Sequence, residues 1–308
     1  MDTIDRFRGC LVGLAVGDAV GTTVEFRPRG SFAPVTDMVG GGPFRLAAGQ
    51  WTDDTAMALC LATSLLDSSG FDAADQMERY CRWRETGYLS CTGHCFDVGN
   101  TTAAALARFR QTGSAFAGNT SPHSAGNGSL MRLAPVPLFC YPDIDAAVRL
   151  AGESSRTTHG AAECIAACQL LAKMICLALD GRPREEITAM DPAGFAATPA
   201  IAALAAGDYR HKHFSAIRGS GYVVQSLEAA LFCFTSTGDY EQAILAATNL
   251  GDDADTTAAI CGQLAGAHYG IAGIPGHWRE RLAMRDDILT LAERLYRREG
   301  AEPSRFAQ

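Results

Sequence analysis

The amino-acid sequence predicts an all-α protein, and two observations support that prediction. Apolar residues recur with helical spacing along nearly the whole chain, and no stretch shows the sustained alternation that a half-buried strand needs. Hydrophobic residues make up 47% of the 308 residues and charged residues 19%, a balance typical of compact globular proteins rather than disordered ones. The chain is therefore expected to fold as an orthogonal bundle of many helices.

The predicted helices follow one another with three longer gaps. Their expected ranges, in chain order, are 3–20, 53–68, 72–86, 97–112, 128–138, 143–155, 159–180, 220–235, 239–249, 254–270 and 279–298. The gaps at 21–52, 113–127 and 190–219 each contain apolar or aromatic residues, and none is a Pro-rich or Ser-rich tract. Because none of them resembles a linker, a single domain over residues 1–308 is predicted.

Glycines recur every four residues in the first helix and again in the helix at 254–270. The positions are Gly9, Gly13, Gly17, Gly21, Gly262, Gly266 and Gly270. Glycine inside a helix costs about 1 kcal/mol relative to alanine, so two such series indicate helices that approach each other closely. A membrane span is not expected, because the apolar run over 10–20 is too short and contains Asp18.

The helices at 53–68 and 254–270 each begin with a string of acids and hydroxyls. Such side chains commonly cap free N–H groups and complement the helix dipole, which is the simplest interpretation of either string alone. Each string nevertheless carries more acid than a cap needs. The residues are Thr52, Asp53, Asp54, Asp253, Asp255 and Thr256. Together the strings predict one oxygen-rich site for hard divalent cations, closed when the two ends of the chain pack together.

The formal charge of that site favours two cations over one. Glu25 lies between apolar neighbours and is either an exposed edge residue or a further ligand. If Glu25 and the four aspartates of the strings converge, the charge is −5, which one divalent ion reduces to −3 and two reduce to −1. Two Mg²⁺ or Mn²⁺ ions are therefore the expected cofactors. Such a pair is typical of hydrolases, and phosphoester, amidine and glycosidic bonds all remain open as targets.

Three further helix starts carry polar residues that suit a ligand site. They are Asp97 with Asn100, the segment Gly126-Asn127-Gly128-Ser129, and His159. In the second of these, glycine and asparagine allow successive N–H groups to point into one concavity, which resembles a cradle for phosphate. Each feature also has a structural interpretation, namely a capped helix start, a helix-entry turn or a hydrogen-bonded histidine. The residues alone leave these alternatives open.

Charge and cysteine content restrict the partners and the compartment. The net charge of −8 argues against nucleic acid or an anionic membrane surface as the main partner. Eleven cysteines, an odd number, lie mostly inside predicted helices, and no secretory signal precedes them. Reduced thiols and a cytoplasmic location are expected.

Taken together, these segments resemble the ADP-ribosylglycohydrolase family, most closely the branch typified by the dinitrogenase reductase-activating glycohydrolase. The motifs run in family order over nearly the whole chain. They are Gly13–Gly21, Val24–Phe26, Gly49–Thr55, Asp97–Thr101, Gly126–Arg132, Thr158–His159 and Gly251–Thr257. One departure is Asp252, where related sequences often carry a second glycine.

The resemblance implies an all-α bundle with a binuclear metal cleft, and it assigns roles to the candidate residues. The implied metal ligands are Thr52, Asp53, Asp54, Asp253, Asp255 and Thr256. The implied catalytic residues are Glu25, Asp54 and Asp97. The implied substrate contacts are Asn100, Asn127, Gly128, Ser129 and His159. An acid such as Asp97 near the scissile bond suits a guanidinium, because a carboxylate accepts two parallel N–H bonds from arginine.

The implied activity is the release of ADP-ribose from a modified protein, most simply from arginine side chains. One alternative keeps the fold and changes the bond, to a serine conjugate, a nucleic-acid adduct or O-acetyl-ADP-ribose. Another is a member that binds ADP-ribose without catalysis or serves a crystallin-like structural role. Retention of five converging carboxylates argues against this second alternative, because a pure binder has no need of them.

Overall fold

The computed structural model describes residues 1–299, and the all-α prediction is confirmed for this range. It contains fourteen α-helices and no named strand in these residues. The helices are α1 Thr3–Gly21, α2 Asp53–Asp67, α3 Ala73–Thr86, α4 Asn100–Thr112, α5 Pro135–Cys140, α6 Ile144–Thr158, α7 Ala162–Leu179, α8 Arg184–Thr188, α9 Pro199–Ala206, α10 Val223–Ser236, α11 Tyr240–Thr248, α12 Ala254–Gly273, α13 Gly276–Arg281 and α14 Arg285–Arg297.

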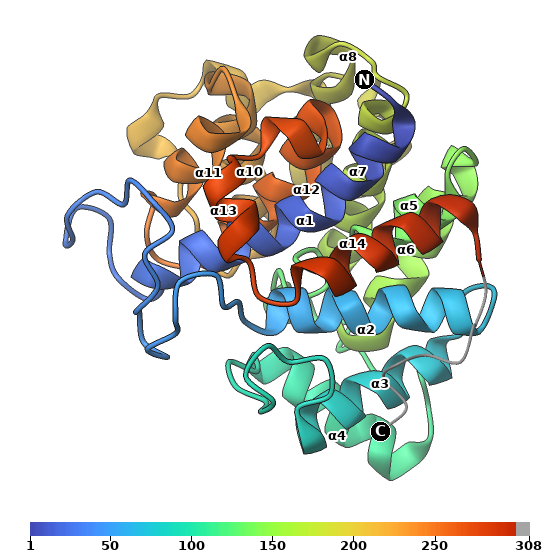
Figure 1. The fold of residues 1–308 in the computed structure, drawn as a ribbon. Coiled ribbons are helices and arrows are strands. Elements are labelled where there is room, and N and C mark those ends of the chain that lie inside the picture. Colours follow the sequence, from blue (N-terminus) through green and yellow to red (C-terminus); the bar gives the residue numbers. More distant parts are fainter. Residues whose placement is uncertain (300–308) are drawn as a thin grey trace.

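Helices α1 and α12 form the centre of the bundle and run side by side through it (Figure 1). The predicted close approach is confirmed, because a Cβ added at Gly13 would collide with the carbonyl oxygen of Gly262, and one added at Gly17 with that of Ala258. The contact brings the two ends of the chain together. It therefore sets the start of α12 beside the segment that follows α1.

The prediction that the first helix is too short to span a membrane is wrong. Its apolar composition is explained instead by its burial inside the protein. The helical stretch Thr3–Val24 has 22 residues and is apolar enough to cross a bilayer, and so is α7. However, 89% of the first window and 67% of the second are buried inside the protein. Both segments serve as core helices of the bundle (Figure 1).

Three predicted boundaries are wrong, for local and tertiary reasons. The helix expected at 128–138 begins only at Pro135, which fixes the backbone for a first helical turn. Helix α9 lies inside the predicted gap 190–219, where a proline at its start and Gly207 (φ 85°) at its end bound a short helix. The helix expected at 279–298 is two helices, because Ala283 donates its N–H to Gly49 and accepts from the indole of Trp51.

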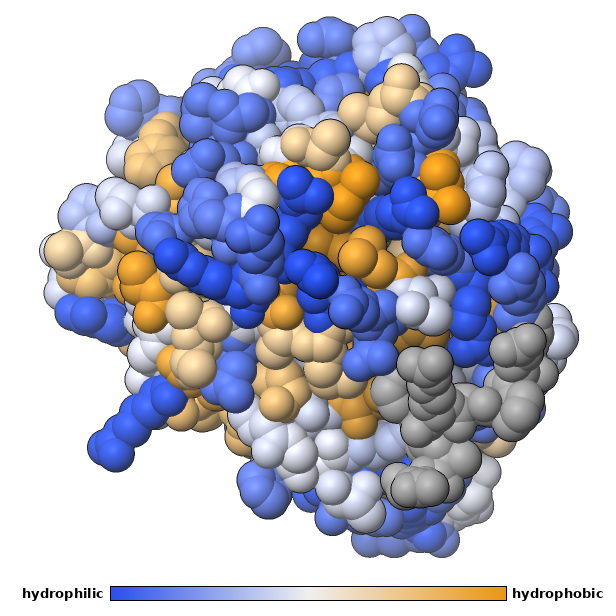
Figure 2. Space-filling model, in the orientation of Figure 1, coloured by the Kyte–Doolittle hydropathy of each residue, from blue (hydrophilic) through white to orange (hydrophobic). Residues whose placement is uncertain are grey.

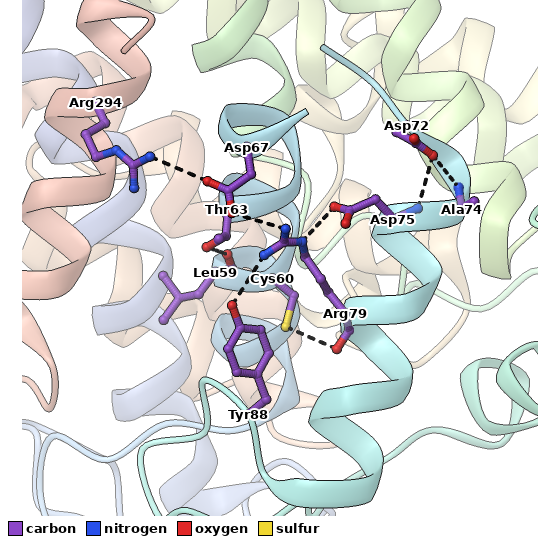
Figure 3. A network of polar contacts seen from close by, with 10 residues as sticks. All are labelled: Leu59, Cys60, Thr63, Asp67, Asp72, Ala74, Asp75, Arg79, Tyr88 and Arg294. Carbon is purple, nitrogen blue, oxygen red and sulfur yellow. Dashed lines mark hydrogen bonds and ion pairs between the residues drawn. The ribbon is translucent and has the colours of Figure 1, made fainter. Parts of the chain in front are cut away.

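A polar network holds the far end of α2 against its neighbours (Figure 3). Arg79 of α3 donates to Asp75 at 2.6 Å, to Asp67 of α2 at 3.1 Å and to the Tyr88 hydroxyl at 3.4 Å. Arg294 of α14 approaches the other oxygen of Asp67 at 3.6 Å. The network ties α2, α3 and α14 together and so fixes the helix whose opposite end carries the first acidic string.

The surface that carries α13 and α14 is mostly hydrophilic, and its hydrophobic residues lie in small groups between polar ones (Figure 2). The segment between α1 and α2 loops outward from the bundle (Figure 1). It carries Phe26, which is 65% exposed although it lines a cavity of about 700 Å³. This loop therefore contributes to the site described next.

Candidate functional site

One cavity of about 700 Å³ opens where several segments of the chain meet. The starts of α2 and α12, the stretch after α1, the loop before α4 and the segment before α5 all contribute to its wall. Of the predicted site residues, it is lined by Glu25, Asp53, Asp97, Asn100, Asn127, Gly128, His159, Asp253, Asp255 and Thr256. Thr52, Asp54 and Ser129 are buried and do not line it.

The start of α2 is capped by a carboxylate from another helix. Asp18 in α1 accepts hydrogen bonds from the backbone N–H groups of Thr52 at 2.9 Å and Thr55 at 3.0 Å, and from both hydroxyls. Burial raises the pKa of Asp18 to about 6, although these hydrogen bonds act in the opposite direction. Asp18 performs the capping, so Asp53 and Asp54 are left for another role.

Sequence reasoning misses Asp18 as a member of the site. In the sequence it appears as a charge that interrupts an apolar run and as part of the Gly13–Gly21 motif, with no role in the site assigned to it. A carboxylate inside such a run must find donors when the helix is buried, because an unpaired buried charge is very costly. The need for donors is the feature of the sequence that could have identified Asp18 as a capping residue. The sequence does not show which helix start supplies those donors.

The two acidic strings contact each other through the threonine hydroxyls of one string and the carboxylates of the other. The Thr256 hydroxyl donates to Asp54 at 3.3 Å, and the Thr52 hydroxyl lies 3.4 Å from an oxygen of Asp255. Asp253 stands at the N-cap position of α12 but makes no side-chain capping bond. Its Oδ2 instead accepts from the amide of Asn127 at 2.7 Å. The strings are thus joined to each other and to the predicted ligand segment.

Glu25, Asp97 and Asp255 form the tightest acidic group, with one oxygen from each lying within 4.8 Å of the others. Burial, together with the charges of Asp97 and Asp253, raises the pKa of Glu25 to about 9. Burial and the charges of Asp18 and Asp253 raise the pKa of Asp97 to about 7. Burial, then Glu25, also raises the pKa of Asp255 well above its ordinary value. The group is therefore under strong mutual repulsion when ionised.

Three carboxylate oxygens in this region are buried without a hydrogen-bond donor in the described part of the chain. They are Oε2 of Glu25, Oδ2 of Asp54 and Oδ1 of Asp255. A buried carboxylate oxygen needs a proton, a donor or a cation. The polar side chains of the two strings and of Asn127 offer carboxylate, hydroxyl and amide oxygens, and this donor set fits a hard divalent cation.

Three residues at the cavity hold left-handed backbone conformations that side chains rarely adopt. They are Phe26 (φ 61°), Asp97 (φ 56°) and Asp252 (φ 55°). Phe26 donates its N–H to the carbonyl of Asp252 at 2.7 Å, and Asp252 donates to that of Arg27 at 2.8 Å. Asp252 therefore joins the loop after α1 to the start of α12 through its backbone, in a conformation that favours glycine. This is a structural role for the residue at which the sequence departs from related ones.

The segment before α5 presents a different ligand surface from the one predicted. No helix follows it directly, and the N–H of Asn127 donates to the carbonyl of Gly221 at 3.1 Å. Within residues 1–299, the N–H groups of Gly128 and Ser129 have no acceptor. The Ser129 hydroxyl points away from the cavity and accepts from Ser155 at 2.9 Å. Contact with a ligand through Ser129 would therefore use its backbone.

The two remaining predicted residues, His159 and Asn100, both line the cavity. His159 follows α6, and burial and the charge of Arg132 lower its pKa to about 3, so the ring is neutral. Asn100 opens α4 with Gly99 as its N-cap, three residues later than predicted. Asp97 is thus released from capping and faces the cavity from the preceding loop.

Comparison with known proteins gives consistent matches over the whole fold. A sequence model of the ADP-ribosylglycohydrolase family matches residues 1–304. A Pseudomonas putida protein named ADP-ribosylarginine hydrolase Tri1 is 48% identical, over 96% of this chain and 79% of its own. The ADP-ribosyl-[dinitrogen reductase] glycohydrolase of Rhodospirillum rubrum is 35% identical, over 91% of each chain. A solved structure described as an ADP-ribosylglycohydrolase-related protein complex superposes with a TM-score of 0.85 at 43% identity, covering 97% of this chain and 99% of that one.

Proposed function

The chain belongs to the ADP-ribosylglycohydrolase family, and from that premise we propose that it removes ADP-ribose from arginine side chains of modified proteins. The bond broken is the N-glycosidic bond between the ribose and the guanidine; water adds to the ribose, and free ADP-ribose is the product. The name of the 48% identical Pseudomonas putida relative supports the arginine linkage. The observation that carries the proposal is the convergence of Glu25, Asp97 and Asp255 in one cavity of about 700 Å³.

Two divalent cations, Mg²⁺ or Mn²⁺, are the proposed cofactors. The residues that would hold them are Thr52, Asp53, Asp54, Asp253, Asp255 and Thr256, with Glu25 beside them. Asp18 and Asp97 join the five carboxylates counted from the sequence, so a single divalent ion would leave a large negative charge in a buried site. When bound, the cations would neutralise the carboxylates and polarise oxygen atoms of the substrate.

Asp97 is the proposed partner of the arginine guanidinium. Its carboxylate faces the cavity, and a planar guanidinium can donate two parallel hydrogen bonds to it. This contact would orient the leaving guanidine, and Asp97 is placed to exchange a proton with it as the bond to ribose breaks. Glu25, which is buried beside Asp97, would complete the acidic end of the site.

The part of the cavity wall formed by His159 and Gly128 is the proposed binding surface for the ADP portion. It offers the neutral ring of His159 and the amide groups of Gly128 and Ser129, all without a carboxylate partner in the described residues. Backbone N–H groups of this kind suit phosphate oxygens. The substrate would thus lie with its anionic part on this surface and its cationic part against Asp97.

We also propose that the protein acts in the reducing cytoplasm. All eleven cysteines are free thiols, and nine of them are buried. A hydrolase of modified intracellular proteins would meet its substrates there.

A panel of conjugates tests the arginine assignment. Asp97→Asn should slow release of ADP-ribose from ADP-ribosyl-arginine by about 100-fold, because the carboxylate that orients the guanidinium is lost. Release from a serine conjugate or from O-acetyl-ADP-ribose, which lack a cationic leaving group, should change much less if it occurs at all. Unchanged arginine hydrolysis by Asp97→Asn, or wild-type hydrolysis confined to another conjugate, would overturn the arginine assignment.

A further inference from the structure

Beneath the ligand side of the cavity lies an arginine that is completely buried and has no carboxylate partner. Arg132 is 0% exposed, and no ion pair involves it within residues 1–299. Its guanidinium lies 4.5 Å from the centre of the Tyr80 ring. Its Nη1 donates to the Gly128 carbonyl at 3.2 Å, and its Nη2 donates to the Thr158 hydroxyl at 2.6 Å. A buried cation placed in this way contacts both the ligand segment and the residue before His159.

The hydroxyl of Thr158 also lies 2.8 Å from Nδ1 of His159. Arginine carries only donors, so the Thr158 oxygen must accept from Arg132. The hydroxyl proton of Thr158 then needs an acceptor, and Nδ1 of His159 is the one within hydrogen-bond distance in the described part of the chain. In this arrangement Nδ1 accepts a hydrogen bond and cannot carry the proton of the neutral ring.

The other ring nitrogen of His159 faces the ligand segment. A Cβ added at Gly126 would lie 3.4 Å from Nε2, and one added at Gly128 would lie 3.1 Å from it. The two glycines therefore leave space beside this nitrogen that larger residues would fill. No acceptor within residues 1–299 bonds to Nε2, and the residue lines the cavity. The proton on Nε2 would be available to a bound ligand.

We propose that Arg132 and Thr158 are positioning residues that hold the neutral ring of His159 with its proton on Nε2, so that it donates a hydrogen bond to an acceptor oxygen of the ligand. The inference rests on the proposed function for the identity of that ligand, ADP-ribose. Because Arg132 also bonds to the Gly128 carbonyl, the same guanidinium aligns the ring and the segment beside it. A phosphate or ribose oxygen is the acceptor that such a donor suits.

The protonation site of the ring can be measured without any turnover. Protein labelled with ¹⁵N in histidine gives long-range ¹H–¹⁵N correlations that distinguish a proton on Nε2 from one on Nδ1, and a His159→Gln sample identifies the signal. We expect wild-type His159 to carry its proton on Nε2. Thr158→Val should abolish this preference, whereas Thr158→Ser should preserve it. A proton on Nδ1 in the wild type, or an unaltered preference in Thr158→Val, would overturn the inference.

A matched control and a binding measurement separate positioning from general damage. Thr157→Val removes the neighbouring buried hydroxyl, which bonds to Ser154 and Gln76 but not to His159, and it should leave the ring proton on Nε2. Calorimetry with ADP-ribose should show affinity reduced about tenfold in Thr158→Val and restored in Thr158→Ser. Loss of the Nε2 preference in Thr157→Val would also count against the inference.

The same experiments keep the two proposals apart. A proton on Nε2 together with no hydrolysis of any conjugate would remove the proposed function and leave the positioning of the ring intact. Hydrolysis of ADP-ribosyl-arginine by a protein whose His159 carries its proton on Nδ1 would do the reverse.

Discussion

Removal of one carboxylate from the buried acidic group is expected to stabilise the cation-free protein. Asp255 places an oxygen within 4.8 Å of those of Glu25 and Asp97. Two ionised groups at that separation repel by about 3.5 kcal/mol at an effective dielectric of about 20. Proton uptake relieves part of this repulsion, since the pKa of Glu25 is raised to about 9 and that of Asp97 to about 7. Asp255→Asn should therefore raise the free energy of unfolding near pH 8 by about 2 kcal/mol, or Tm by roughly 3 °C.

The pH dependence of the cation-free wild type follows from the same groups. Glu25 and Asp97 bind protons more tightly in the folded chain than in the unfolded one, so the folded protein holds more protons between about pH 4 and 9. Its stability is greatest at the acidic end of this window. It then falls as pH rises, by up to about 1.4 kcal/mol per pH unit for each titrating carboxyl. Addition of Mg²⁺ or Mn²⁺ near neutral pH should restore stability in the wild type and much less in Asp255→Asn.

Thermal melting in chelator, followed by circular dichroism at about pH 5.5 and about pH 8, measures both effects. Glu241→Gln on α11 is a matched control, because it removes one exposed negative charge from a residue that does not line the cavity. The repulsion would be refuted if Asp255→Asn were less stable than the wild type in chelator at the higher pH. A cation-free wild type that gained stability on going from the lower to the higher pH would refute it equally.

Three further substitutions test the packing, the cap and the strained loop. Gly13→Ala in α1 forces a Cβ onto the carbonyl oxygen of Gly262, so the free energy of unfolding in urea should fall by about 3 kcal/mol. The control Gly194→Ala places its Cβ in open space and should change the free energy of unfolding by less than about 0.5 kcal/mol. Asp18→Asn should weaken Mn²⁺ binding, measured by calorimetry, by about 10- to 100-fold because the start of α2 loses its anchor, and an unchanged affinity would remove Asp18 from the site. Asp252→Val should cost about 2 kcal/mol in urea unfolding and Asp252→Gly less than about 0.5 kcal/mol, and equal costs would contradict a backbone role for this residue.

The sequence predicts the long helices well because their starts and packing faces are encoded locally. The glycine series in α1 and α12 is sufficient to indicate their contact, and the start of α2 is visible in its Thr-Asp-Asp string. The break between α13 and α14 is not encoded locally. It arises because Ala283 bonds to Gly49 and to Trp51, residues more than two hundred positions away in the chain.

The candidate site is predictable to the extent that residue chemistry alone determines it. Surplus acids at two helix starts indicate a cation site, and the structure brings them together around one cavity. Which residue performs which role depends on contacts between segments that are far apart in the sequence. Asp18 caps α2 from another helix, and the Ser129 side chain turns toward Ser155 rather than the cavity. The roles of individual ligands and substrate contacts remain predictions.

The proposal of a metal-dependent ADP-ribosylarginine hydrolase is tested most directly by measuring release of ADP-ribose from ADP-ribosyl-arginine by the purified protein. It should be made before chelation, after complete chelation, and after Mg²⁺ or Mn²⁺ is added back. We predict release that is lost in chelator and restored by at least one of the two cations. Full activity after complete removal of metal, or no release with either cation, would contradict it.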